Sequence, residues 1–193
     1  RESVRVAYNA AINACAEKGL SGKAGALLGR MKKRGVPPDG GSYTAAVKAC
    51  RRRGDAERAL RHLRDMRAAG IPPKRIAYNY AMSACGRGGR PEEALWLLGE
   101  MRLEGLEPNR ISYTSAMDAC AKAKDVKQVL RLLADMKAAG IDPDEVTYHI
   151  AVDAACAAKE LPTALLLFKD MRSRGLEVDR RRVDYIIRKL KGG

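Results

Sequence analysis

One spacing runs through the whole chain: three residue types recur every 35 positions in an unbroken register. The tyrosines of this series are Tyr8, Tyr43, Tyr78, Tyr113 and Tyr148. The methionines are Met31, Met66, Met101, Met136 and Met171, and the glycines are Gly35, Gly70, Gly105, Gly140 and Gly175. A fixed period of this size is typical of stacked supersecondary units. The chain is therefore expected to fold as a tandem array of one 35-residue repeat.

Each repeat predicts a hairpin of two short helices. In the third repeat, apolar residues follow Tyr78 at spacings of three, four and seven, which is one face of a helix. Pro91 suits the first turn of a second helix, whose apolar stripe ends at Met101. Gly105 fits the left-handed position after a helix, and Pro108 prevents its continuation. Because strand patterns are absent, the predicted fold class is all-α.

A single helical hairpin cannot bury its apolar face, so neighbouring hairpins must stack into a continuous core. The predicted repeats are residues 5–39, 40–74, 75–109, 110–144 and 145–179. A C-terminal capping helix is predicted at about residues 180–191, with Val183, Ile186 and Ile187 on its apolar stripe. Residues 1–193 are interpreted as one repeat array, since no linker or second domain is visible.

The charge balance favours an anionic partner. The chain has 37 Lys and Arg against 23 Asp and Glu, a formal net charge of +14. This excess exceeds the magnitude of about 2–8 that suits a small domain for solubility. It indicates nucleic acid first and an anionic membrane surface second. No apolar run approaches the roughly 20 residues of a transmembrane helix, and no signal or transit peptide is recognisable.

The cysteines and histidines do not predict a metal site, a cofactor or catalysis. Four cysteines follow the repeat period, and Cys156 lies one place later; the periodic ones are Cys15, Cys50, Cys85 and Cys120. Equivalent residues of stacked hairpins lie roughly 8–10 Å apart, too far for a disulfide, so we expect small buried side chains. His62 and His149 fall in different repeats without a ligand pattern. As it stands, the chain is not expected to be an enzyme.

Several stretches of the repeat resemble the pentatricopeptide repeat family. They include Ile-Ala-Tyr-Asn at 76–79, Glu-Glu-Ala-Leu at 92–95 and Gly-Leu-Glu-Pro-Asn at 105–109. The resemblance covers five consecutive repeats without insertion. The tetratricopeptide family, whose members bind peptides, has a period of 34 and a Trp-x-x-Leu-Gly pattern that is missing here. The resemblance implies a right-handed superhelical solenoid of helix-turn-helix repeats that binds single-stranded RNA, one base per repeat.

The resemblance implies two base-reading positions in each repeat. One follows the tyrosine: Asn9, Thr44, Asn79, Thr114 and His149. The other ends the repeat: Asp39, Lys74, Asn109, Asp144 and Asp179. The family's pattern then implies uridine for the first repeat, a pyrimidine for the third and guanosine for the fourth. Thr44 suggests a purine for the second, although Lys74 departs from the common pairs, and His149 gives no preference.

Helix capping is the alternative for these polar residues, because Asn, Thr and Asp often satisfy free N–H groups at a helix start. Ser42, Ser112 and Thr147, which precede their tyrosines, are interpreted as the better N-caps. That interpretation leaves the following residues free to read bases. The tyrosines themselves begin the apolar stripe, so core packing is favoured over base stacking for them.

Two further positions are implied to contact RNA. Apolar side chains two residues before the tyrosine are expected to wedge between bases: Val6, Ile76, Ile111 and Val146. Gly41 occupies this place in the second repeat, which should hold its base poorly. Basic residues nine after the tyrosine are expected at the phosphates: Arg52, Arg87 and Lys122. The alternatives are burial against the neighbouring hairpin and solvated surface charge. Second-helix arginines such as Arg61, Arg64 and Arg67 are interpreted as solubilising charges.

The predicted function is sequence-selective binding of single-stranded RNA, in the splicing, processing or stabilisation of organelle transcripts. The resemblance implies a chloroplast or mitochondrial location. Two alternatives remain open: the RNA-docking module of a larger RNA-processing enzyme, and a scaffold for protein interactions. A protein partner or a homodimer through an exposed end of the array is also possible at this point.

Overall fold

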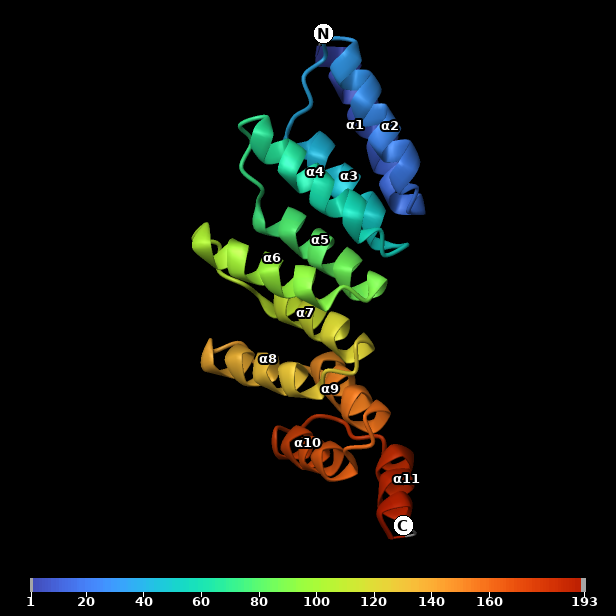
Figure 1. Ribbon diagram of the computed structural model, residues 1–193, viewed down its shortest axis with the longest axis vertical. Coiled ribbons are helices and arrows are strands. Elements are labelled where there is room, and N and C mark those ends of the chain that lie inside the picture. Colours follow the sequence, from blue (N-terminus) through green and yellow to red (C-terminus); the bar gives the residue numbers. More distant parts are fainter. Residues whose placement is uncertain (1, 192–193) are drawn as a thin grey trace. The chain divides into compact units, whose positions relative to one another are not determined.

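The computed structural model describes residues 2–191, apart from some side chains of the last helix. Within this part of the chain every regular element is a helix (Figure 1). In order, the helices are α1 (Glu2–Lys18), α2 (Ser21–Lys33), α3 (Gly40–Arg51), α4 (Ala56–Ala68), α5 (Arg75–Gly88), α6 (Pro91–Leu103), α7 (Arg110–Lys122), α8 (Val126–Ala138), α9 (Glu145–Ala157), α10 (Leu161–Ser173) and α11 (Arg180–Lys191). The predicted all-α tandem hairpin fold is confirmed.

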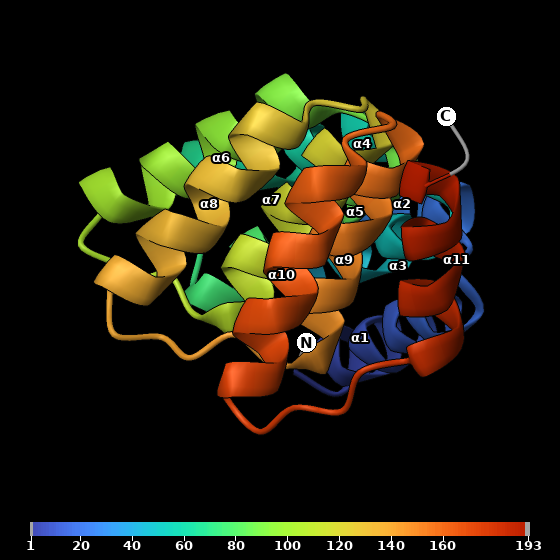
Figure 2. The same cartoon turned by 90° about the horizontal axis from the view of Figure 1, so that it is seen from below.

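Contacts divide the chain into two compact lobes: an N-terminal lobe, Arg1–Pro108, and a C-terminal lobe, Asn109–Gly193. In the N-terminal lobe the first helices of successive hairpins, α1, α3 and α5, contact one another in series, and each second helix packs against its own first helix. In the C-terminal lobe α7 contacts α9, and α11 contacts α10 on the side opposite α8 in Figure 2. That all five repeats form one domain stays a prediction.

The glycines of the 35-residue series end the second helices, as the sequence predicts. They adopt left-handed φ angles of 65–74° at Gly35, Gly70, Gly105, Gly140 and Gly175. The next residue returns its N–H to the carbonyl of the periodic methionine, for example from Ile71 to Met66 at 3.1 Å. This 6→1 bond satisfies a carbonyl that would otherwise lack a partner at the helix end. The hairpin turn uses the same conformation at Gly19, Gly54 and Gly89, but at Lys124 and Lys159 in the last two repeats.

The first helices begin one turn earlier than their expected N-caps. Asp39 accepts a hydrogen bond from the backbone N–H of Ser42 at 2.8 Å, and Asp144 accepts one from Thr147 at 2.9 Å. Asn109 does the same for Ser112 at 3.1 Å. The prediction that Ser42, Ser112 and Thr147 are N-caps is therefore wrong. They are the third helical residues, and the buried hydroxyls of Ser42 and Ser112 accept the N–H of the cap residue in return. The Thr147 hydroxyl instead donates to the Asp144 carboxylate at 2.7 Å.

The core of each lobe is built from the periodic residues. Tyr43, Tyr78, Tyr113 and Tyr148 are at most 2% exposed, as are the five periodic methionines. The interpretation of the tyrosines as core residues is confirmed for these four, whereas Tyr8 is half-buried. All five cysteines are free, and Cys50, Cys85 and Cys120 are buried. Burial raises the pKa of the Cys50 and Cys85 thiols to about 12, so these thiols stay protonated.

Consecutive hairpins are also joined by a recurring set of three polar groups. A basic residue just after the periodic methionine reaches the next repeat's tyrosine and an acidic residue that precedes the next methionine. Arg67 contacts the Tyr78 hydroxyl and pairs with Glu100 at 3.1 Å. Two further sets are Lys32 with Tyr43 and Asp65, and Lys137 with Tyr148 and Asp170. The interpretation of Arg67 as a mere solubilising charge is therefore wrong.

Candidate nucleic-acid interface

The residue after each tyrosine lies at the margin of the buried stripe, because successive helix residues are rotated by about 100°. Asn9, Thr44, Thr114 and His149 are accordingly half-buried, with part of each side chain open to solvent. Asn79 differs, since only 7% of it is exposed. The expectation that all five reading residues lie on the surface is wrong for Asn79. Periodicity assigns the helix face, but the surrounding side chains decide how deeply a residue on that face is covered.

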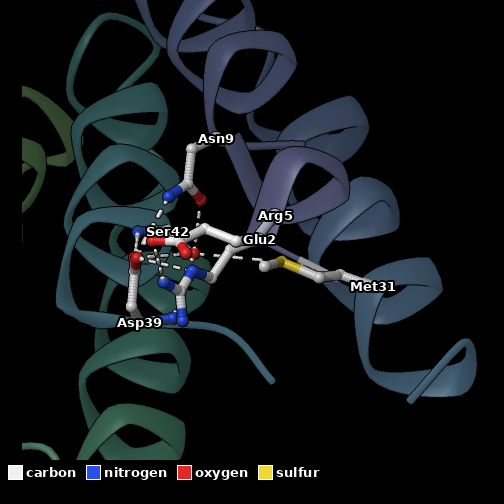
Figure 3. A network of polar contacts seen from close by, with 6 residues as sticks. All are labelled: Glu2, Arg5, Asn9, Met31, Asp39 and Ser42. Atoms are coloured by element: carbon white, nitrogen blue, oxygen red, sulfur yellow. Dashed lines mark hydrogen bonds and ion pairs between the residues drawn. The ribbon is translucent and has the colours of Figure 1, made fainter. Parts of the chain in front are cut away.

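The first repeat brings its two reading residues into direct contact. The Asn9 amide nitrogen donates to both carboxylate oxygens of Asp39, at 3.2 Å each. The Ser42 hydroxyl donates to the Asn9 amide oxygen at 2.5 Å, and Arg5 lies 3.6 Å from the Asp39 carboxylate. Figure 3 shows these side chains converging between α1 and the start of α3. Asn9 and Asp39 are 30 residues apart in the sequence, and the helical hairpin between them brings them into contact.

This network orients the hydrogen-bonding groups of the first repeat. Burial raises the pKa of the Asp39 carboxyl, but the hydrogen bonds from Ser42 and Asn9 and the charge of Arg5 outweigh it, so the net pKa is lowered. Asp39 is therefore an anion at neutral pH. Because the two Asp39 oxygens are equally far from the Asn9 amide nitrogen, one N–H can serve both as a bifurcated donor, which leaves the second N–H and one carbonyl lone pair for another partner. A donor beside an acceptor is the complement of the uracil edge, on which an N–H group lies between two carbonyl oxygens.

The fourth repeat uses the same positions with a different internal contact. Thr114 donates its hydroxyl to the Arg110 carbonyl of its own helix at 2.9 Å. Asp144 caps α9 and pairs through its other oxygen with the Arg110 guanidinium at 3.4 Å. Burial raises the pKa of the Asp144 carboxyl, and the Thr147 hydrogen bonds and the Arg110 charge lower it further than burial raises it. The two reading residues are thus linked through Arg110.

The reading residues of the second, third and fifth repeats have fewer described side-chain contacts with each other. In the second repeat Thr44 is half-buried and Lys74 is exposed at the N-cap of α5, without a side-chain cap bond. In the third repeat Asn79 belongs to the N-terminal lobe and Asn109 to the C-terminal lobe. In the fifth repeat Asp179 is exposed and accepts the Arg181 N–H at 3.0 Å.

Capping and base reading are therefore not exclusive alternatives. The capping interpretation is confirmed for Asp39, Asn109 and Asp144, which end one repeat and cap the first helix of the next. In the two aspartates one oxygen serves the cap, and the other is directed to the preceding repeat's first helix. The residues after the tyrosines do not cap their helices. Their role in base reading stays a prediction.

The apolar residues before the tyrosines are exposed. Val6 is 61% exposed, Ile76 50%, Ile111 57% and Val146 62%. The alternative that they are buried against a neighbouring hairpin is therefore wrong, and their wedging role stays a prediction. At Gly41 an added Cβ would lie 3.2 Å from an Asp39 carboxylate oxygen. A wedging side chain in the second repeat would therefore require the carboxylate that caps its first helix to shift by a few tenths of an ångström.

The expected phosphate contacts lie at the C-terminal ends of first helices and are exposed. Arg52 follows α3, and the aliphatic part of its side chain packs against Gly19. A Cβ added at Gly19 would lie only 2.7 Å from the Arg52 Cβ, so a side chain there would clash. Lys122 ends α7 and pairs with Asp118 at 2.8 Å. Arg87 lies in the last turn of α5. Such partly solvated groups can exchange a carboxylate partner for a phosphate, but this role also stays a prediction.

Sequence reasoning missed the arginines three residues before the tyrosines, Arg5 and Arg110. The signal that could have found them is helical spacing, since each lies four residues before a reading residue and hence on the same helix face. In the described residues no group of three His, Cys, Asp or Glu side chains could hold a metal ion. No helix of residues 2–191 is long and apolar enough to cross a membrane.

Comparison with known protein families gives matches along almost the whole chain. A profile described as the PPR repeat family matches residues 73–122 and 111–157. A pentatricopeptide repeat domain profile matches residues 26–88, and a PPR repeat profile matches residues 6–36 and 146–176. Together these matches extend from residue 6 to residue 176. A search of curated protein sequences found no significant match.

Solved structures share the fold. The PPR domain of Arabidopsis thaliana protein-only RNase P 1, solved in complex with tRNA, aligns with a TM-score of 0.80 and 17% identity over 97% of this chain and 98% of that one. The maize pentatricopeptide repeat protein PPR10 aligns at 0.72 with 30% identity. PPR10 in complex with an 18-nt psaJ RNA element aligns at 0.78 with 29% identity, over 91% of this chain and 26% of that one. This chain therefore spans about a quarter of PPR10.

Proposed function

The chain belongs to the pentatricopeptide repeat family, and from that premise we propose that it binds single-stranded RNA, one base per repeat. In this proposal each base lies against the N-terminal half of a first helix, beside the residue after the tyrosine and the residue that ends the repeat. The complex of PPR10 with an 18-nt RNA element supports RNA as the ligand. The net charge of +14 supports a polyanionic partner.

The observation that carries the proposal is the exposure of four branched aliphatic side chains at one register. Val6, Ile76, Ile111 and Val146 are 50–62% exposed, although each lies two residues from a fully or partly buried tyrosine. A single exposed aliphatic side chain is ordinary on a protein surface. Here the exposed aliphatic side chain recurs in four of five repeats, beside polar residues that can contact base edges. A single strand whose bases are splayed apart requires such a regular series of apolar and polar contacts.

The predicted site is about five nucleotides long: uridine, a purine, a pyrimidine, guanosine and an undetermined base. The first repeat supports uridine most directly, because Asn9 retains a donor and an acceptor after its bonds to Asp39 and Ser42. The second repeat is expected to contribute least, because Gly41 provides no wedge and Lys74 cannot accept a hydrogen bond.

The chain acts by binding rather than by catalysis, in the splicing, processing or stabilisation of transcripts. We assign it to the chloroplast or the mitochondrion on the basis of the family. The structural neighbours include the nuclear proteinaceous RNase P 2 of A. thaliana, so the compartment has to be tested independently. Organelle fractionation with detection of the endogenous protein decides it, and recovery in the nuclear fraction would refute the assignment.

The binding test uses a library of randomised RNA and the purified chain. Selected RNAs are sequenced, and the dissociation constant of the best sequence is measured by fluorescence anisotropy at two salt concentrations. We expect selection of the predicted bases at the first and fourth positions and weaker binding at higher salt. A randomised single-stranded DNA library of the same length is the control for charge alone.

Three results would contradict the proposal. Equal affinity for RNA and DNA of any sequence would mean that binding is purely electrostatic and not sequence-selective. Absence of RNA binding at low salt, together with a specific protein partner, would favour the scaffold alternative. Cleavage or base conversion of the RNA by the purified chain would show that it is an enzyme.

A further inference from the structure

Arginine accompanies the acidic reading residue in the two repeats whose acid is held most firmly. The residue three before the tyrosine is Arg5 in the first repeat and Arg110 in the fourth. Arg5 Nε lies 3.6 Å from Asp39 Oδ2, and Arg110 Nη1 lies 3.4 Å from Asp144 Oδ2. The same pair of positions, 34 residues apart, thus forms the same contact once in each lobe.

The contact involves the same oxygen in both repeats. Oδ1 of Asp39 and of Asp144 accepts the cap hydrogen bond from the backbone, at 2.8 and 2.9 Å. Oδ2 does not serve the cap, and it is the oxygen that the arginine approaches in both repeats; in Asp39 it also accepts from the Asn9 amide nitrogen at 3.2 Å. Arg110 is further held because its Nε donates to the Asp142 carbonyl at 3.2 Å. The arginine therefore orients the oxygen of the reading carboxylate that does not serve the cap.

The other repeats lack this combination in sequence. The second has Gly40 and Lys74, the third has Arg75 with the neutral Asn109, and the fifth has Glu145 with Asp179. In the fifth repeat the Glu145 carboxylate accepts the Glu177 N–H at 3.4 Å. A fixed, charge-compensated carboxylate is thus confined to the first and fourth repeats, for which the family's pattern implies a definite base.

We propose that Arg5 and Arg110 are positioning residues for base selection: they orient Asp39 and Asp144 and offset the carboxylate charge beside the RNA. This inference rests on the proposed RNA-binding function. A carboxylate near a phosphodiester backbone is repelled over distances of about 8–10 Å in physiological salt. The guanidinium cancels that repulsion locally, and its planar donors keep Oδ2 in one orientation. The base that can donate to this oxygen is then favoured over bases that cannot.

The inference separates selectivity from affinity. A phosphate contact contributes equally to every RNA sequence, whereas a positioning residue changes the ratio of affinities for two bases at one place. Loss of Arg110 should therefore alter discrimination at the fourth nucleotide and leave the first unchanged. Loss of Arg5 should do the reverse, because Arg5 approaches the reading carboxylate Asp39 and Arg110 approaches the reading carboxylate Asp144. Arg5 also lies 3.7 Å from the Glu2 carboxylate, which is not a reading residue.

The test compares Arg110→Gln and Arg5→Gln with the wild type on RNAs that differ only at the first or the fourth nucleotide. We expect the affinity ratio at the matching nucleotide to fall about threefold or more, and Arg110→Lys to restore part of it. Arg131→Gln, which removes one exposed positive charge from α8, is the matched control and should leave both ratios unchanged. Glu145→Arg supplies the missing arginine beside Asp179 and should raise discrimination at the fifth nucleotide.

The outcomes distinguish this inference from the proposed function. If the wild type selects bases but the arginine variants keep its ratios, or lose affinity for all RNAs equally, the positioning role is refuted and RNA binding stands. If the wild type binds no RNA, both are refuted. Circular dichroism of each variant identifies a loss of fold, and the gain expected from Glu145→Arg does not depend on removing any existing contact.

Discussion

At the scale of single residues, the side chains that end each repeat serve two purposes at once. Asp39 caps α3 through one oxygen and meets Asn9 and Arg5 with the carboxylate as a whole. Asp144 combines a cap with the Arg110 contact in the same way. Folding and recognition therefore constrain the same position, so a substitution there must be judged by two measurements.

Asp39 allows these two purposes to be separated. Asn is as good an N-cap as Asp, so Asp39→Asn should keep the cap and lose only the contacts with Asn9 and Arg5. Its unfolding free energy should therefore fall less than that of Asp39→Ala, which should be lowered by about 1 kcal/mol or more. Both variants remove the negative charge and should alter base preference at the first nucleotide. Urea denaturation and affinity measurements on RNAs that differ at that nucleotide check the two effects. Unchanged preference in Asp39→Asn would mean that Asp39 only caps the helix.

At the scale of helices, neighbouring hairpins are joined by charged groups as well as by apolar packing. The ring of each periodic tyrosine in α3, α5 and α9 is buried, while its hydroxyl or ring face meets a basic residue of the preceding second helix. This arrangement gives a reason for tyrosine rather than phenylalanine at the start of the stripe, because a phenylalanine could not bond the basic and acidic groups that flank it.

Arg67 is the basic residue with the most contacts in this series, since it meets Tyr78, Glu100 and Glu104. Arg67→Ala should lower the unfolding free energy by about 1–2 kcal/mol, because it removes charged hydrogen bonds between two hairpins. Arg61, which pairs with Glu57 on the exposed side of the same helix, is the matched control. Arg61→Ala should cost about 0.3–0.5 kcal/mol. Equal losses in urea denaturation would show that the Arg67 contacts contribute nothing beyond a surface pair.

The burial of His62 predicts that the stability of the protein depends on pH. It is 6% exposed, and its ring nitrogens have no hydrogen-bond partner among the described residues. Burial lowers the pKa of His62, and the charge of nearby Asp65 opposes this while Arg61 and Lys32 reinforce it. The unfolded chain therefore binds a proton more readily than the folded one. Stability is fully present above the unfolded pKa of about 6.5 and falls as the pH drops below it.

The measurement is the urea midpoint between about pH 7.5 and pH 5. The carboxylates with lowered pKa values, such as Asp39 and Asp144, lose their contribution only below about pH 4, so this window isolates the histidine. His62→Leu should abolish the fall in the midpoint. A variant that keeps the same pH dependence would show that another group is responsible.

At the scale of the whole molecule, the excess of positive charge sets the salt dependence of binding. Arg52, Arg87 and Lys122 occupy one register in three successive repeats and are exposed. Each contact between a basic side chain and a phosphate of single-stranded RNA contributes about 0.7 to the magnitude of the slope of log affinity against log salt concentration. Replacing the three by Gln should lower the magnitude of this slope by about 2 and weaken all RNA sequences alike.

Anisotropy titrations at several salt concentrations check this expectation. A triple variant with Arg61, Arg64 and Arg131 replaced by Gln removes the same charge from second helices and is the control. If both variants lower the slope equally, the three first-helix residues contribute no more to phosphate binding than basic residues elsewhere on the surface. Loss of selectivity without a change of slope would mean that they contact bases.

Most of the secondary structure followed from local physics. The period of 35, the apolar spacing of three, four and seven, and the glycines after each methionine predicted two helices in each repeat, which the structure bears out. Pro91 at the first position of α6 and Asp55 and Asp125 as caps of α4 and α8 were also predictable, because each depends on residues within one helical turn. The N-caps of the first helices were misassigned, since Ser42 and Asp39 are both good caps and lie one turn apart.

The sequence by itself determined the repeat, its two helices and the identity of the buried tyrosines and methionines. All of these are properties of one hairpin and its period. The tertiary structure decided which polar groups meet: Asn9 with Asp39, Arg5 and Arg110 with their aspartates, and Arg67 with Tyr78. It also decided that Asn79 is buried while Thr44 and Thr114 are not. These contacts join side chains that are 11 to 34 residues apart on different helices, and their separation depends on how the helices pack rather than on which residues recur.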